Sequence, residues 1–147
     1  MSENISIFVG DDPSIEECRR IVEDHFDASL RRSSEENDNY TAFECEISGV
    51  FINIFDNHNL EDNCGIEFTR FPLEIDFTSY AGNVIPRWEE APFLSRIFSL
   101  AEKLAQRFRA RCIVVRNLQQ TVCSIDPPSC AEGPRKGTGA EKGDVAP

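Results

Sequence analysis

The sequence predicts an α+β fold, in which a mostly antiparallel sheet of about five to six strands carries two helices packed on one face. Two segments, near residues 13–27 and 92–109, repeat apolar side chains at intervals of three and four, as amphipathic helices do. Between them, residues 30–80 alternate apolar and polar side chains, which is typical of strands with one solvated face. With 147 residues, of which 40% are hydrophobic, we expect a single α+β domain at residues 1–125.

The N-terminal part of the domain should contain one strand and one helix. Ile5–Val9 is a short β-rich run that ends at Gly10. A helix is expected from Pro13 to about Asp27, with Asp12 as the N-cap and Pro13 at the first helical position. The apolar face of this helix would consist of Ile15, Cys18, Val22 and Phe26.

The alternating region predicts an antiparallel meander of about four strands, preceded by a possible short strand at Leu30–Ser33. Pro72 interrupts the region, because proline cannot donate a hydrogen bond inside a sheet. The four strands are expected at Thr41–Ile47, Val50–Phe55, Ile66–Arg70 and Leu73–Thr78. Their polar sides would place rows of carboxylates on the face opposite the helices, at Glu44, Glu46, Glu67, Glu74 and Asp76.

The second helix and the last strand follow this region. The helix is expected at about Pro92–Arg109, with a broad apolar stripe on one side and Arg or Lys on the other. Cys112–Val115 is apolar at every position, which indicates a strand buried inside the sheet. Large apolar residues are almost absent after Ile125, so residues 126–147 are expected to form a disordered tail.

The acidic residues are concentrated in one part of the chain. Met1–Tyr80 contains 19 Asp or Glu and 5 Arg, whereas Ala81–Ile125 contains 7 Arg or Lys and 3 Glu. The whole chain has a net charge of −11. Such a field repels nucleic acid and anionic lipid but attracts a basic protein, so neither a nucleic acid nor a membrane is expected as a direct partner.

The sequence contains no signal for export or membrane insertion. No stretch approaches the roughly 20 apolar residues of a membrane span, and the N-terminus lacks a basic region followed by a long apolar one. We therefore expect the protein to be cytoplasmic. The six cysteines show no paired spacing, and reduced thiols are the favoured interpretation in that compartment.

No set of residues predicts catalysis, a metal or another cofactor. No Ser or Cys has a base at a recognisable spacing, and Asp11 and Asp12 after Gly10 would repel a phosphate. The loop Asp56–Asp62 combines oxygen ligands with His58, but it lacks the central glycine of a calcium loop. A solvated hairpin loop is the favoured interpretation, and the protein is not expected to be an enzyme.

Three features resemble the small acidic immunity proteins of bacterial toxin and contact-dependent growth inhibition systems. They are a single α+β domain of this size, the acidic turn Ser34–Asp38, and a closing Ala- and Leu-rich helix that leads into Arg111–Arg116. The resemblance implies a non-enzymatic inhibitor that binds and neutralises a cognate toxin, with a basic nuclease-type effector as the expected target. The candidate toxin-binding residues, chosen for charge and expected exposure, are Glu35, Glu36, Asp38, Tyr40, Asp56, Glu61, Asp62 and Trp88.

Two other functions stay open at this point. The chain could be a homodimeric adaptor or structural protein, in which the acidic part of one copy meets the basic helix of another. It could also be a small ligand- or metal-binding domain that uses the loop Asp56–Asp62.

Overall fold

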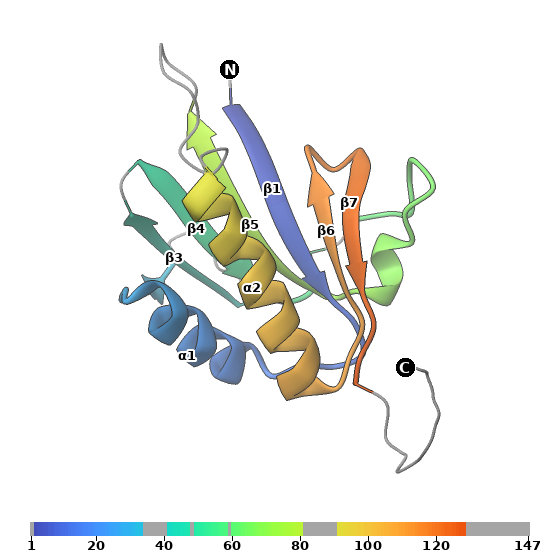
Figure 1. Ribbon diagram of the computed structural model, residues 1–147, viewed down its shortest axis with the longest axis horizontal. Coiled ribbons are helices and arrows are strands. Elements are labelled where there is room, and N and C mark those ends of the chain that lie inside the picture. Colours follow the sequence, from blue (N-terminus) through green and yellow to red (C-terminus); the bar gives the residue numbers. More distant parts are fainter. Residues whose placement is uncertain (1, 34–40, 48, 59, 81–90, 129–147) are drawn as a thin grey trace.

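The computed structural model describes residues 2–33, 41–47, 49–58, 60–80 and 91–128. In these residues seven strands form one antiparallel sheet, and two helices lie on one of its faces (Figure 1). The order of the strands across the sheet is β2-β3-β4-β5-β1-β6-β7. The elements in chain order are β1 (Ser2–Val9), α1 (Ile15–Phe26), β2 (Arg31–Arg32), β3 (Ala42–Ile47), β4 (Val50–Phe55), the 3-10 helix η1 (Phe68–Arg70), β5 (Leu73–Tyr80), α2 (Ala91–Phe108), β6 (Cys112–Arg116) and β7 (Gln120–Ile125).

The predicted α+β class and the placement of both helices on one face are confirmed. The main core lies between the sheet and the two helices, because every second side chain of each central strand points toward them. Fully buried members come from β1, β4, β5, β6 and α2, among them Ile7, Ile52, Ile75, Val114 and Leu104.

The start of α1 differs from the prediction. Ser14, and not Asp12, is the N-cap, and its hydroxyl accepts a hydrogen bond of 3.3 Å from the backbone N–H of Glu17. Pro13 therefore precedes the cap instead of opening the helix. The cap moves because the serine hydroxyl lies three residues before Glu17, the spacing at which a capping side chain reaches a free N–H.

The segment predicted as a strand at Ile66–Arg70 does not form one. Asn63 and Ile66 form an isolated bridge, η1 follows, and only after Pro72 does the chain enter β5. The loop between β4 and β5 instead places apolar side chains on the helix-free face of the sheet, where they form a second core cluster. This cluster consists of Phe8, Ile66, Phe68, Phe71, Ile113 and Val115, with Leu60 and Leu118 packed against it.

Glu67 consequently lies exposed in this loop and outside the predicted carboxylate rows. The physical reason is that Ile66, Phe68 and Phe71 together bury more apolar surface on β1 and β6 than an exposed edge strand would. The loop is also not the simple solvated hairpin that was predicted, because His58 packs edge-on against Phe8, with ring centres 5.3 Å apart.

The strand β7 was not predicted. It pairs with β6 through a tight turn, in which the N–H of Gln119 donates to the carbonyl of Arg116. Both central residues of this turn, Asn117 and Leu118, have positive φ angles, as a type I′ hairpin turn requires. Asparagine tolerates that conformation and leucine does not favour it, but Leu118 gains burial against the second core cluster.

Candidate functional site

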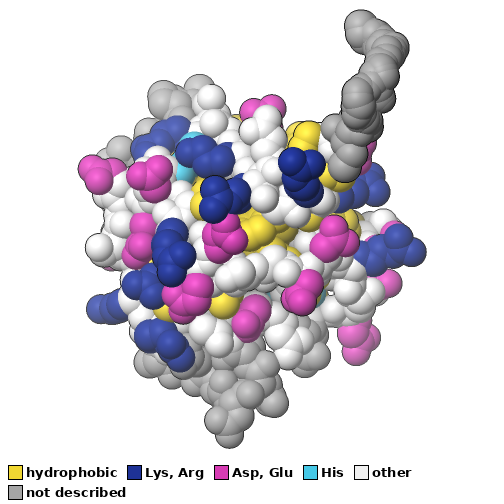
Figure 2. All heavy atoms as spheres, turned by 90° about the horizontal axis from the view of Figure 1, so that it is seen from below, with side chains coloured by type: hydrophobic (Ala, Val, Ile, Leu, Met, Phe, Trp, Pro, Cys, Tyr) yellow, Lys and Arg dark blue, Asp and Glu magenta, His cyan; other side chains and the backbone are white. Residues whose placement is uncertain are grey.

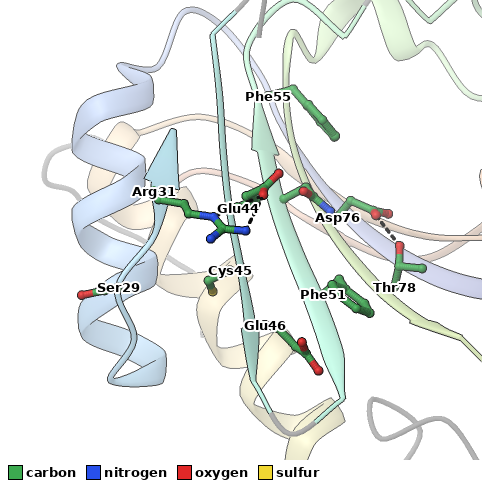
Figure 3. A pocket seen from close by; sticks show the side chains of 10 residues that line it. Ser29, Arg31, Glu44, Cys45, Glu46, Phe51, Phe55, Asp76 and Thr78 are labelled. Carbon is green, nitrogen blue, oxygen red and sulfur yellow. Dashed lines mark hydrogen bonds and ion pairs between the residues drawn. The ribbon is translucent and has the colours of Figure 1, made fainter. Parts of the chain in front are cut away.

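The helix-free face of the sheet has two halves. The loop between β4 and β5 covers the half formed by β1 and β6 through the second core cluster. The half formed by β3, β4 and β5 contains a depression of about 790 Å³, here called the basin. Figure 3 shows it from close by. The residues that line the basin are Ser29, Arg31, Glu44, Cys45, Glu46, Phe51, Asn53, Phe55, Asp76 and Thr78.

Strand register explains why these side chains meet. Arg31, Glu44, Asn53, Asp76 and Ser6 stand opposite one another across the five neighbouring strands β2, β3, β4, β5 and β1. Side chains at directly opposed positions lie on the same face of a sheet. The row therefore leads from the exposed edge of the basin to the covered half of the sheet.

A second row, next to the first, consists of Glu46, Phe51, Thr78 and Asn4. Glu46 is exposed. Phe51 is a large apolar side chain at this end of the basin, and 36% of its surface is exposed. Phe51 and Phe55 come from the same strand, β4, and both line the basin (Figure 3). The basin thus combines carboxylates with aromatic surface.

The outer end of the basin contains an ion pair. The Arg31 guanidinium lies 3.1 Å from Glu44 Oε2 and is itself largely exposed (Figure 3). Hydrogen bonds from Ser33 and Arg31 lower the pKa of Glu44, so that this carboxylate is charged at neutral pH. Such an exposed pair contributes little to stability, which leaves Glu44 available to other cations.

The floor of the basin continues into a buried pair of carboxyl groups, Glu74 and Asp76. Ser6 Oγ lies 3.0 Å from Glu74 Oε2 and 3.0 Å from Asp76 Oδ1. Asp76 Oδ1 also accepts a 2.8 Å hydrogen bond from Asn4 Nδ2, and the Thr78 hydroxyl donates to Asp76 Oδ2 (Figure 3). Only 7% of Glu74 and 8% of Asp76 is exposed, which makes this the most deeply buried acidic pair of the described residues.

Burial changes the acidity of both groups. Removal from water, reinforced by the negative charge of Asp76, raises the pKa of Glu74 to about 7. Burial also raises the pKa of Asp76, although hydrogen bonds from Thr78, Asn4 and Ser6 act in the opposite direction. A carboxyl group with a pKa near 7 is able to exchange a proton at neutral pH.

Both histidines serve the fold. The His58 ring bonds to the carbonyl of Phe71 through Nε2, and its Nδ1 accepts a 2.9 Å hydrogen bond from the N–H of Leu60. His25 bonds in the same way, through Nε2 to the carbonyl of Arg96 at 2.8 Å and through Nδ1 to Lys103 Nζ at 3.1 Å. Burial lowers the pKa of each ring, so both are neutral at pH 7.

The described cysteines are all free thiols. Burial raises the pKa of Cys45 to about 11 and that of Cys112 to about 12, and it raises the pKa of Cys18 further still. These thiols are poor nucleophiles, because the thiolate is the reactive form. Among the described residues, no group of three or more His, Cys, Asp or Glu is arranged to hold a metal ion.

Only three of the eight predicted toxin-binding residues belong to the part of the chain that the structure describes. Glu35, Glu36, Asp38, Tyr40 and Trp88 lie outside the described residues. The other three predicted residues belong to the loop between β4 and β5, and none of them lines the basin. They are Asp56, Glu61 and Asp62.

Two of these three residues are engaged locally. Asp56 Oδ1 accepts a 2.6 Å hydrogen bond from the N–H of Thr41, which connects the loop to the start of β3. Asp62 Oδ1 accepts hydrogen bonds from the N–H and the hydroxyl of Thr69 at 3.0 and 2.8 Å. These backbone and hydroxyl bonds lower the pKa of Asp62. The rows of Glu44, Glu46, Glu74 and Asp76, in contrast, were predicted correctly from the alternation along β3 and β5.

The basic side of α2 is used within the fold. Arg107 forms an ion pair with Glu17 of α1, and Arg96 donates a 2.9 Å hydrogen bond to the carbonyl of His25. Figure 2 shows the molecule from below Figure 1, the side at which α2 ends. Lys and Arg side chains lie among Asp and Glu side chains there, with apolar surface between them. Arg96 and Arg107 therefore hold α2 against α1.

Neither α1 nor α2 combines the length and the apolar character that a bilayer-crossing helix requires. Comparison of the chain with protein-family models and with the curated proteins finds no match.

Proposed function

We propose that this protein is a non-enzymatic inhibitor of the immunity type, which binds and neutralises a basic protein toxin through the basin. The observation that carries the proposal is the basin itself, a half of a sheet face that no described residue covers and in which carboxylates lie beside exposed aromatic surface. The rest of that sheet face is covered by the loop between β4 and β5. The cytoplasm, where such a toxin would act, is the proposed location.

Charge supports a basic partner. Glu44 and Glu46 lie at the open side of the basin, and the chain as a whole has a net charge of −11. Complementary charge speeds encounter by a factor of roughly 10 to 1,000 and disfavours partners of the same sign. A nuclease, which has a basic active site for its phosphate substrate, is the kind of toxin that this surface would suit.

Phe51 supplies the apolar anchor that a tight protein complex needs. Hot spots of protein interfaces are large side chains at the centre of a patch, surrounded by groups that exclude water. Phe51 is an exposed large side chain of this kind, and it lies between Glu46 and Thr78 in the register of the sheet. Tyr40 and Trp88, the aromatic anchors predicted from the sequence, lie outside the described residues.

The test is a growth rescue. The C-terminal domain of the long reading frame that flanks this gene would be expressed in a test bacterium, with this chain supplied in trans. We expect growth arrest by the flanking domain and rescue by the wild-type chain. The double variant Glu44→Lys/Glu46→Lys should lose rescue, and the association rate of the purified proteins should fall about tenfold or more.

The matched control changes the same charge elsewhere. Asp24→Lys/Glu102→Lys alters two exposed carboxylates on α1 and α2, far from the basin, and should still rescue. Loss of rescue by both double variants would mean that net charge, and not the basin, determines binding. Toxicity without rescue by the wild-type chain would contradict the proposed function.

The strand β7 favours a second candidate, a homodimeric interaction protein. β7 is the edge of the sheet, contains no charged residue, and exposes 45% of Val122. An uncharged edge strand is a template for pairing with another strand. A dimer in sedimentation equilibrium that Val122→Lys dissociates would support this function, and a wild-type monomer at high concentration would exclude it.

A further inference from the structure

The contacts of Ser6 require at least one proton on the buried carboxyl pair. Ser6 Oγ is 3.0 Å from an oxygen of Glu74 and 3.0 Å from an oxygen of Asp76. A serine hydroxyl has a single hydrogen and can donate only one hydrogen bond. An ionised carboxylate only accepts, so the second contact requires a proton on one of the two carboxyl groups.

The neighbours of each carboxyl group indicate which one holds the proton. Asp76 accepts from the Asn4 amide, which has no alternative to donating, and it also contacts the hydroxyls of Ser6 and Thr78. Glu74 has Ser6 as its one hydrogen-bond partner among the described residues. Hydrogen bonds to a carboxylate favour its charged form, so Asp76 is the ionised partner and Glu74 the protonated one.

The buried carboxyl pair has no cation partner among the described residues. In the described part of the chain, no Lys or Arg forms an ion pair with either carboxyl group. The groups that face the pair from β1, β4 and β5 are the neutral side chains of Asn4, Ser6, Phe8, Asn53, Phe55 and Thr78. The nearest charged groups in the same row are Glu44 of β3 and Arg31 of β2, beyond Asn53. From the loop, the neutral His58 ring packs on Phe8.

We infer that Glu74 and Asp76 hold one proton between them at neutral pH, with Ser6 as the bridge, and that this proton makes the fold and the charge of the basin sensitive to pH. In this arrangement the Glu74 carboxyl donates to Ser6 Oγ, and the Ser6 hydroxyl donates to Asp76 Oδ1. Loss of the proton leaves two buried negative charges side by side, and neither of them has a cation partner.

The shared proton has two consequences, one for stability and one for binding. Because the pKa of Glu74 in the folded protein is about 7, above its ordinary value of 4.5, the folded state holds more protons than the unfolded state between these values. The contribution of Glu74 to stability is therefore greatest in mild acid and is lost as the pH rises through about 7. Asp76 also lines the basin, so a cation bound there should displace the proton. That second consequence rests on the proposed function, whereas the proton itself can be tested on the free protein.

The first test observes the carboxyl carbons by NMR during a pH titration of the ¹³C-labelled wild-type protein. We expect the Glu74 carboxyl to titrate with a midpoint near 7. The Glu44 carboxyl, whose pKa is lowered by Ser33 and Arg31, serves as the internal reference and should titrate in acid. A Glu74 midpoint at or below 4.5 would overturn the inference without any variant.

The second test compares thermal unfolding between pH 5 and 9. Glu74→Gln keeps the shape of the side chain and donates from an amide at all pH values, so it should lack the fall in melting temperature that Glu74 causes between about pH 5 and 7. Glu46→Gln makes the same replacement at an exposed position of the same sheet face and should retain the wild-type profile. A Glu74→Gln protein with the wild-type pH profile would overturn the inference, and a variant that fails to fold would leave the decision to the NMR titration.

Discussion

The two halves of the helix-free face belong to one sheet and yet differ in what covers them. Where β1 and β6 present Phe8, Ile113 and Val115, the loop between β4 and β5 folds back and covers them. Where β3, β4 and β5 present Glu44, Asn53 and other polar groups, nothing among the described residues covers the surface, and the basin forms. The half formed by β1 and β6 therefore contributes to stability through its apolar cover. The half formed by β3, β4 and β5 has no cover among the described residues, and it is the surface through which we propose that the protein binds.

The boundary between the halves is chemical. In one row of the sheet register, Phe55, Glu74, Phe8 and Ile113 follow one another, so that a carboxyl group separates the aromatic rings of the basin from those of the second core cluster. The buried proton of Glu74 lies on this line. Its neutralisation allows the apolar cover to begin directly beside a charged surface.

The largest expected effect separates the halves by stability. Phe68→Ala should reduce the free energy of unfolding by about 3 kcal/mol, because Phe68 is 2% exposed and packs on Phe8, with ring centres 5.0 Å apart. Phe51→Ala, the matched change in the basin, should cost less than about 1 kcal/mol. Urea unfolding measures both. Equal losses would mean that the basin is part of the core and would break the comparison.

A smaller effect is expected at the imidazole that holds the cover in place. His58→Ala removes the hydrogen bonds to the Phe71 carbonyl and from the Leu60 N–H, and should cost about 1–2 kcal/mol. Amide hydrogen exchange should quicken in residues 60–72 and remain unchanged in β3. Faster exchange throughout the sheet would show that the cover is not a separate cooperative unit.

Acidification should act on the same cover in the wild-type protein. The pKa of His58 is lowered from its ordinary value of 6.5 by burial, so the unfolded state binds a proton more readily than the folded state. Stability should therefore fall as the pH drops below 6.5, opposite in sign to the effect of Glu74. The exchange rate of the Leu60 amide, after correction for intrinsic rates, measures this loss, and His58→Ala should not show it.

The smallest effect is expected at the outer end of the basin. Arg31→Ala should leave the free energy of unfolding within experimental error, because the ion pair with Glu44 is exposed. The pKa of Glu44 should rise only in part, since Ser33 is the larger cause of its lowering. A clear loss of stability would indicate that Arg31 packs more tightly than its exposure suggests.

The sequence predicted what depends on regular periodicity. The alternation along Ala42–Ile47 and Leu73–Tyr80 placed Glu44, Glu46, Glu74 and Asp76 on one face, because a strand repeats every two residues whatever its neighbours are. The same rule failed for Ile66–Arg70. There, the alternation of Ile66 and Phe68 reflects burial against another part of the chain instead of a strand of its own.

The burial and the raised pKa of the carboxyl pair could not be predicted from periodicity along a strand. The raised pKa of Glu74 depends on burial and on the negative charge of Asp76. Ser6 and Asn4 of β1, which bond to this pair, are about 70 residues away and become its neighbours only through strand order. Sequence reasoning treated the carboxylates as an exposed surface, because nothing local indicates that two of them are buried. Similarly, β7 was missed because its turn places Leu118 at a positive φ, which local preference disfavours.

The position of β1 has a consequence for how the chain folds. Ile7 pairs with Ile75 on one side and with Val114 on the other, so β1 meets its partners β5 and β6 only after most of the described sheet has been synthesised. Contacts of such long sequence separation slow folding, because a large loop must close before any of them forms. During synthesis, β1 emerges from the ribosome before either of its partner strands. It is paired on both sides only after β6 has emerged. The incorporation of β1 into the sheet is thus a late event, and β1 is the strand that a chaperone would have most time to bind.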